Sequence, residues 1–210
     1  MSRGLLIILE GPDGSGKTTQ INLLEKYLKE KGHEVLKTRE PGGTAISEKI
    51  REIILDNKNT EMCGMCEALL YAASRAQITS QVLKPALDQG KMVICDRFVY
   101  SSIVYQGVGR GLGQERIKYI NEAAIDGLEP DLTIMLTIPY EEGLKRKYKQ
   151  RELDRLENSG TDFHKKVFEG YLEISRKYDK IKVVDANRDM EEIHGDIVKL
   201  VEQLIKTQQK

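Results

Sequence analysis

The chain has 210 residues, 40% of them hydrophobic, which is enough for one sizeable core, so we expect a single domain over residues 1–210. Its 33 basic and 33 acidic side chains balance, which excludes the overall positive field that holds nucleic acid or an anionic membrane. The first apolar run, Leu5–Leu9, is far too short for a secretory or membrane-spanning segment, so we expect a cytoplasmic protein.

The first predicted element is a strand at Leu5–Leu9, and a glycine-rich loop follows it. The loop satisfies the pattern G-x-x-x-x-G-K-[ST] with Gly11, Pro12, Asp13, Gly14, Ser15, Gly16, Lys17 and Thr18. Apolar residues at helical spacing follow over residues 21–28, so the loop joins a strand to a helix, as a phosphate-binding loop must. This arrangement indicates a nucleoside triphosphate site.

The chemistry of such a loop assigns roles to its residues. Its glycines let successive backbone N–H groups turn inward onto a phosphate, and the helix N-terminus adds the positive end of its dipole. We expect Lys17 to reach the β- and γ-phosphate oxygens and Thr18 to offer its hydroxyl to Mg²⁺, with Thr19 also at the nucleotide.

Two further strands are predicted at Val35–Thr38 and Met92–Cys95; Arg39 follows the first, and Asp96 and Arg97 follow the second. Stretches with helical spacing lie between them, at residues 46–54, 69–76 and 82–87. Because the carboxyl ends of parallel strands meet at one edge of a sheet, both arginines and the glycine-rich loop should converge there. For either arginine alone, a surface salt bridge is an equally good interpretation.

Two thiols lie in the stretch before residues 69–76. Cys63 and Cys66 form a C-x-x-C pair, with no second pair and no histidine nearby. Three cysteines in all favour reduced thiols over a disulfide framework. We favour two ordinary thiols, and a metal or redox site is the alternative.

The last strands are predicted at Leu132–Ile138 and Ile181–Val184, and a cationic segment lies between them. Lys145 to Arg155 reads K-R-K-Y-K-Q-R-E-L-D-R, with six cations among eleven residues. Such a run is either a solvated helix face or part of a lid, about residues 143–157, that carries arginines to a reaction centre. Strands alternating with helices predict an α/β fold of the P-loop NTPase type, a five-stranded parallel sheet with helices on both faces.

These motifs together resemble the thymidylate kinase family. They are E-G-P-D-G-S-G-K-T, R-E-P-G-G-T, L-L-Y-A-A-S-R-A-Q, D-R-F-V-Y-S-S-I-V-Y-Q-G and R-E-L-D-R-L, in family order from Glu10 to about Leu156. The second and fourth are far more specific than the glycine-rich loop. The resemblance implies ATP-Mg²⁺-dependent phosphorylation of dTMP to dTDP, a step of dTTP biosynthesis, by a homodimer formed through helices.

The resemblance also implies residues for the phosphate and the sugar of the acceptor. Arg97, helped by Arg39 and with Pro41 beside them, would hold the acceptor phosphate, since a guanidinium matches phosphate oxygens bidentately. Asp13 would accept from the 3′-hydroxyl, and Tyr105 would crowd out a 2′-hydroxyl.

Further residues are implied at the two bases. Tyr71 would stack on thymine, and Arg75 would donate to a thymine carbonyl. Ser102 and Gln106 would complete the recognition of this base, and Asn187 would border adenine. For Tyr71 and Tyr105, an aromatic side chain that fills core is the alternative.

The acceptor phosphate is largely dianionic near neutral pH, since its second pKa is about 6, so no strong base is needed. Catalysis should then be positioning and electrostatics, by residues of the loop, the third strand end and the lid: Lys17, Asp96, Arg97, Arg151 and Arg155. Arg146 is a third candidate lid arginine. Asp96 would hold Mg²⁺ or orient the acceptor, with helix capping or arginine pairing as the alternative.

The sequence departs from the family in two places. Ile78 stands where a histidine is frequent, and Gly14 or Ser15 where several relatives carry an arginine, so the lid must supply that charge.

Another nucleoside monophosphate kinase, a deoxynucleoside kinase and a nucleotide-dependent switch are the alternative functions. The sequence lacks the N-K-x-D motif of guanine-nucleotide switches, and the paired arginines suit a hydroxyl acceptor poorly.

Overall fold

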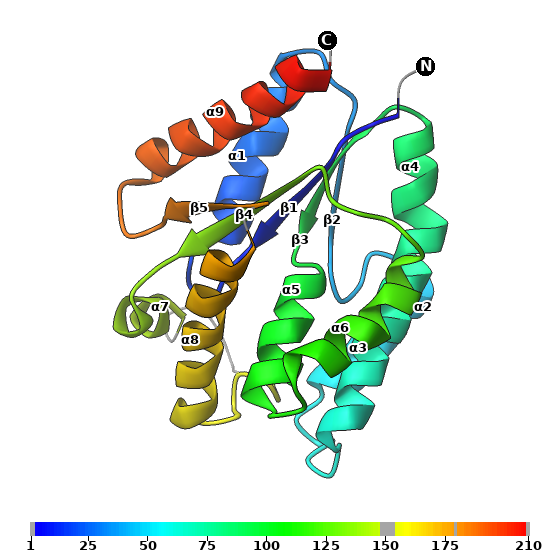
Figure 1. Ribbon diagram of the computed structural model, residues 1–210, viewed down its shortest axis with the longest axis vertical. Helices are drawn as coiled ribbons and strands as arrows, with labels where there is room; N and C mark the ends of the chain where they lie inside the picture. The colour runs from blue at the N-terminus through cyan, green and yellow to red at the C-terminus, as the bar shows by residue number, and fades with distance from the viewer. Residues whose placement is uncertain (1–2, 148–153, 179, 209–210) are drawn as a thin grey trace.

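The computed structural model describes residues 3–147, 154–178 and 180–208, and a five-stranded sheet runs through its centre (Figure 1). In chain order the strands are β1 (Leu6–Glu10), β2 (Val35–Arg39), β3 (Met92–Asp96), β4 (Leu132–Thr137) and β5 (Ile181–Asp185). They lie side by side as β2-β3-β1-β4-β5, and every pairing is parallel. The predicted α/β class is confirmed, and each predicted strand agrees with the observed one to within a residue at either end.

Helices cover both faces of this sheet (Figure 1). The longer ones are α1 (Lys17–Glu30), α2 (Ala45–Leu55), α3 (Gly64–Ile78), α6 (Gln114–Ile125), α7 (Tyr140–Lys147), α8 (Thr161–Lys177) and α9 (Met190–Gln208). Shorter segments are α4 (Lys84–Asp88), α5 (Val99–Ser102) and the π-helical turns η1 (Thr79–Leu83) and η2 (Ile103–Gly109). Within the described residues, no helix is long and apolar enough to cross a membrane.

The central strand β1 is buried along its whole length, as a parallel strand between two helical layers should be. Its side chains alternate between the layers: Ile7 and Leu9 join the core under α1 and α9, whereas Leu6 and Ile8 join the core under η1 and α4. Because β1 is packed on both faces, its end is fixed relative to the helices, and with it the start of the glycine-rich loop that follows.

Helix α3 has a different inward face from the one that apolar spacing suggests. Leu69, in the stretch with helical spacing, is 52% exposed. The buried face instead carries the polar residues Glu67, Ser74 and Arg75. Buried polar groups must find partners inside the protein, so this face of α3 forms a polar network beside the hydrophobic contacts of Ala68 and Ile78.

The register of the sheet brings three strand ends level with one another. Leu9 of β1 and Arg39 of β2 both lie opposite Asp96 of β3. The segments that begin at Glu10, Arg39 and Asp96 therefore leave the sheet at the same edge, as predicted for a ligand site of an open parallel sheet.

Candidate active site

A cleft with a volume of about 1150 Å³ opens at this edge of the sheet. Most of the predicted site residues line it: Asp13, Gly14, Ser15, Gly16, Lys17, Thr18, Thr19, Arg39, Pro41, Tyr71, Asp96, Arg97, Ser102, Tyr105, Gln106 and Arg146. Five described residues of the prediction lie outside its lining: Gly11, Pro12, Arg75, Arg155 and Asn187. Arg151 lies outside the residues that the structure describes.

The glycine-rich loop holds its lysine over the backbone. Lys17 Nζ donates to the carbonyl oxygens of Gly11 and Pro12, both at 2.9 Å. Burial, and after it the positive charge of Arg97, lowers the pKa of Lys17 to about 8, although the nearby carboxylates oppose this shift. The ammonium group is thus fixed at the point where the loop turns into α1.

The tip of the loop has no room for a side chain. Gly14 has a φ of 78°, and a Cβ built there would lie 2.2 Å from the carbonyl oxygen of Gly143 in α7. An arginine at position 14 would therefore displace α7. Ser15 is buried, so in this chain neither position offers a cation to the cleft.

Arg97 connects the third strand end to the glycine-rich loop. Its Nη1 donates to the carbonyl oxygen of Gly11 at 3.0 Å and to Tyr171 Oη at 2.9 Å, and its Nη2 pairs with the Asp13 carboxylate. Tyr105 lies alongside and donates from its hydroxyl to Asp13 Oδ2 at 3.2 Å. Arg97 has a φ of 69°, a strained conformation for a side-chain-bearing residue and one that concentrates at functional sites.

Glu10 fixes the segment around Arg97, and its role was not predicted. This buried carboxylate accepts hydrogen bonds from the backbone N–H of Phe98 at 2.9 Å and of Ser101 at 3.1 Å, and from the Ser101 hydroxyl. An acidic residue that ends an apolar strand directly before the loop was the available signal, because a carboxylate there must be paired.

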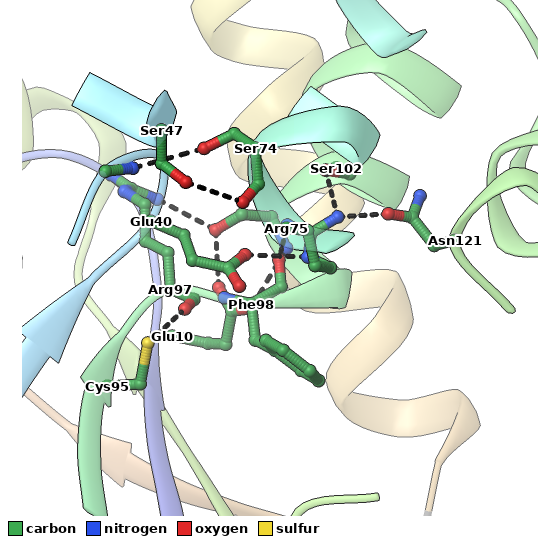
Figure 2. A network of polar contacts seen from close by, with 12 residues as sticks. Glu10, Glu40, Ser47, Ser74, Arg75, Cys95, Arg97, Phe98, Ser102 and Asn121 are labelled. Carbon is green, nitrogen blue, oxygen red and sulfur yellow. Dashed lines mark hydrogen bonds and ion pairs between the residues drawn. The ribbon is translucent and has the colours of Figure 1, made fainter. Parts of the chain in front are cut away.

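Arg75 lies behind the wall of the cleft. Its guanidinium is 1% exposed and lies between Glu40 on one side and Ser102 and Asn121 on the other (Figure 2). It donates to Glu40 Oε2 at 2.7 Å, to Ser102 Oγ at 3.0 Å, to the Phe98 carbonyl at 2.8 Å and to Asn121. Burial raises the pKa of Glu40 to about 7, against the charge of Arg75. Donation by Arg75 itself to a thymine carbonyl stays a prediction.

Two more arginines lie on the rim of the cleft. Arg39 is half exposed and pairs with Glu48 at 2.8 Å, the salt bridge that was the alternative interpretation for it. Arg51 of α2 was not predicted; it lines the cleft and donates to the Pro41 carbonyl at 2.9 Å. Its place within an amphipathic helix pattern gave no signal, since only tertiary packing turns it toward the cleft.

A family model described as thymidylate kinase matches residues 9–197. The chain belongs to the thymidylate kinase family. It is 50% identical over 200 residues to the thymidylate kinase of Clostridium novyi, and the matched region covers 94% of this chain and 98% of the relative. It is 53% identical over 194 residues to that of a Geobacillus species, with 91% and 92% covered, and 48% identical over 204 residues to that of a Thermoanaerobacter species, with 97% and 100% covered. The resemblance seen in the motifs, and with it the prediction of a phosphotransferase enzyme, is confirmed.

In this thymidylate kinase family chain, a buried carboxylate accepts hydrogen bonds from two segments, η2 with its C-terminal cap and the lid. Glu67 of α3 is fully buried and accepts from Arg110 Nε at 3.1 Å, Arg155 Nη2 at 2.7 Å and Gln106 Nε2 at 2.9 Å. Burial by itself would raise the pKa of Glu67, but the hydrogen bonds from Arg110 and Gln106 outweigh it, so the pKa is lowered. Sequence reasoning missed Glu67 because it lies in a helix pattern that favours an exposed acid.

The two described lid arginines differ in position: Arg146 lines the cleft and Arg155 does not. Arg155 donates to Glu67 and, at 2.7 Å, to the Ile54 carbonyl, so its guanidinium is held away from the glycine-rich loop. Arg146 lines the cleft and donates to the carbonyl of Ala186 at 3.2 Å. Of the described lid arginines, Arg146 is therefore the one in contact with the cleft.

Asn187, predicted to border adenine, lies outside the lining of the cleft, and its role stays a prediction. Asn187 is exposed, and its backbone N–H bonds Asp185 Oδ1 at 2.9 Å. Arg188 and Asp189, the next residues of the same loop, line the cleft together with Met190, the first residue of α9.

Two oxygen donors face the cleft beside Lys17. Asp96 Oδ1 is buried and finds no hydrogen-bond partner among the described residues. Thr18 lies exposed in the same lining.

The thiols of Cys63 and Cys66 are free and exposed. Within the described ranges, no group of three or more His, Cys, Asp or Glu residues is placed to hold a metal ion, and these two cysteines belong to no such group. Cys63 caps α3, accepting from the Cys66 N–H at 3.5 Å.

Proposed function

We propose that this thymidylate kinase family member transfers the γ-phosphoryl group of ATP onto dTMP, giving ADP and dTDP, a step of dTTP biosynthesis. One observation carries the proposal: Arg97 is bonded to the glycine-rich loop through Gly11 and Asp13 and lines the same cleft as Tyr71 and Gln106. A donor-phosphate site and an acceptor site are thus contiguous, and in-line transfer between two nucleotides requires such contiguity.

The donor phosphates would be held by the loop. Backbone N–H groups at residues 13–18 and the N-terminus of α1 bind the phosphates, and Lys17 moves its ammonium group from the carbonyls of Gly11 and Pro12 onto the β- and γ-oxygens. The lysine is near its target already, so little rearrangement is needed.

The acceptor would be held by guanidinium groups. An oxygen of the dTMP phosphate attacks the γ-phosphorus, and the bond from the γ-phosphorus to the bridging oxygen breaks, releasing ADP. Arg97 binds the acceptor phosphate with its planar fork and limits the repulsion between the two anions. Arg39 and Arg51 supply further positive charge on the rim.

A magnesium ion fits the oxygen donors beside Lys17. Mg²⁺ keeps most of its waters and takes one or two protein oxygens, and Thr18 with Asp96 offers such a pair. The buried, unpaired Asp96 Oδ1, judged within the described part of the chain, supports this assignment. When bound there with ATP, the ion would neutralise charge on the phosphates.

The lid would complete the charge balance. We assign Arg146 to the transferred phosphoryl group because it lines the cleft, and Arg151 keeps its predicted role. Arg155 would act as an anchor, tying the end of the lid to Glu67. Closure over ATP would exclude water and limit hydrolysis.

The sugar and the subunit contact complete the proposal. Asp13 and Tyr105 are already bonded to each other; Asp13 would accept a hydrogen bond from the 3′-hydroxyl, and Tyr105 would exclude a 2′-hydroxyl.

A homodimer formed through α2 and α3 is supported by the apolar side chains that these helices expose: Ile46 at 53%, Ile53 at 48% and Leu69 at 52%. Light scattering would test the dimer, and a cytoplasmic location stays a prediction.

A coupled assay that counts ADP against a panel of monophosphates tests the function. The proposal expects turnover that depends on dTMP, lower turnover with dUMP, and its loss in Lys17→Met. Slow turnover without any acceptor would favour a nucleotide-dependent switch, and preference for another monophosphate would identify a different kinase; either result contradicts the proposal.

A further inference from the structure

The two ends of the Gln106 side-chain amide face different surroundings: its nitrogen faces Glu67 in the interior, and its oxygen faces away from Glu67. Gln106 is 1% exposed, lines the cleft, and donates from Nε2 to Glu67 Oε1 at 2.9 Å. Its Oε1 is buried and has no hydrogen-bond partner within residues 3–147, 154–178 and 180–208. A buried amide oxygen without a partner beside a ligand cleft indicates that a ligand completes it.

The charge of Glu67 decides which end of the amide faces the cleft. An ionised carboxylate only accepts hydrogen bonds, so the Gln106 NH₂ group must turn toward it and the oxygen must turn away. Glu67 is kept ionised by Arg110 at 3.0 Å and Arg155 at 2.7 Å, and it is fully buried. The orientation of the Gln106 amide is therefore fixed and does not change freely.

A donor lies in the same wall. Ser102 Oγ accepts from Arg75 Nη1 at 3.0 Å, which leaves its own hydroxyl proton available to the cleft. The wall thus presents an acceptor from Gln106 and a donor from Ser102. A pyrimidine that carries a ring N–H beside a carbonyl, as thymine and uracil do, matches this pair, whereas cytosine has an unprotonated ring nitrogen at that position.

We propose that Glu67 is a positioning residue for base recognition: it fixes the Gln106 amide with its oxygen toward the cleft and so selects a pyrimidine N3–H. This inference rests on the proposed function, because it places the base of a pyrimidine monophosphate in the cleft. Glu67 touches no substrate and acts through Gln106.

The experiment compares kcat/KM for dTMP, dUMP and dCMP in purified variants. In Glu67→Gln the new amide can accept or donate, so Gln106 can turn over and offer its NH₂ group to cytosine. We expect the preference for dTMP over dCMP to fall about tenfold, the worth of one misplaced buried hydrogen bond. The preference for dTMP over dUMP should stay constant, since both bases carry N3–H.

Arg110→Met is the matched control. It removes an ion pair from the same buried carboxylate but leaves the bond between Glu67 and Gln106, so at mildly alkaline pH the dTMP to dCMP preference should not change. Should Glu67→Gln not fold, the double variant Glu67→Met and Arg110→Met removes the carboxylate together with one of its two guanidinium partners, and Arg155 keeps its bond to the Ile54 carbonyl. The preference should fall in this double variant.

A double-mutant cycle makes the test specific. If Glu67 acts through Gln106, then Glu67→Gln has no further effect on the base preference in a Gln106→Met background. An equal effect in both backgrounds, or an unchanged preference in Glu67→Gln, would overturn the inference while leaving the kinase assignment intact. Absence of dTMP turnover in the wild-type enzyme would overturn both.

Discussion

Arg97 Nη1 lies 3.0 Å from the carbonyl oxygen of Gly11, so the arginine proposed to bind the acceptor phosphate is bonded to the backbone of the glycine-rich loop. The same guanidinium pairs with Asp13, a loop residue, and its Nη1 also donates to the Tyr171 hydroxyl. Placement of the acceptor phosphate is therefore coupled to the shape of the loop. This coupling gives the first prediction.

Arg97→Lys should lower kcat/KM for dTMP by about 10²-fold or more, because an ammonium group cannot reproduce the planar fork or its several simultaneous bonds. The affinity for ATP should change much less. Steady-state kinetics together with ATP titration checks this, and thermal unfolding controls for folding. Equal losses in ATP binding and in acceptor kinetics would assign Arg97 to the loop alone.

Gly14→Ala and Gly16→Ala form a matched pair at the glycine-rich loop. Both residues have a positive φ, 78° and 85°, so each alanine carries a left-handed strain of about 1 kcal/mol. A Cβ at position 14 would meet the Gly143 carbonyl at 2.2 Å, whereas one at position 16 meets no heavy atom of the described residues within 4 Å. Gly14→Ala should therefore cost about 2 kcal/mol more in the free energy of unfolding.

Urea unfolding of the two glycine variants measures that difference. Equal destabilisation of the two variants would mean that α7 moves away from the new Cβ without lowering the free energy of unfolding. In that case the loop could accept a side chain at position 14.

Tyr105 gives a prediction on sugar selection. Tyr105→Phe loses the bond of 3.2 Å to Asp13 but keeps the ring, so exclusion of ribonucleotides should persist. Tyr105→Ala opens space and should relax it, which is read as the ratio of kcat/KM for dUMP to that for UMP. If the alanine variant still discriminates against UMP to the same extent, Tyr105 is not the residue that excludes the 2′-hydroxyl.

Acid stability should depend on Glu67. Its pKa is lowered from 4.5, so it contributes stability that is present above pH 4.5 and is lost as pH falls through its folded-state pKa. Glu67→Gln should therefore flatten the dependence of the free energy of unfolding on pH below 4.5. Glu61→Gln, at an exposed position before α3, is the control. Identical slopes in the two variants would contradict the assignment.

The sequence predicts the sheet well because each strand contains a short run rich in aliphatic residues, such as Leu6–Leu9 of β1, that ends at a polar or charged residue. It predicts most of the cleft because motif residues follow strand ends. It does not predict Glu67, Arg51 or the inward face of α3, because these polar side chains sit within ordinary amphipathic patterns. Only tertiary packing turns them inward, and local periodicity carries no record of that packing.

The most direct measurement is a crystal structure with dTMP and a non-hydrolysable ATP analogue bound together. The account predicts the dTMP phosphate on the Arg97 guanidinium, the analogue on the glycine-rich loop, and the thymine beside Tyr71, Ser102 and Gln106. A dTMP phosphate bound away from Arg97, with the thymine outside that wall, would contradict it.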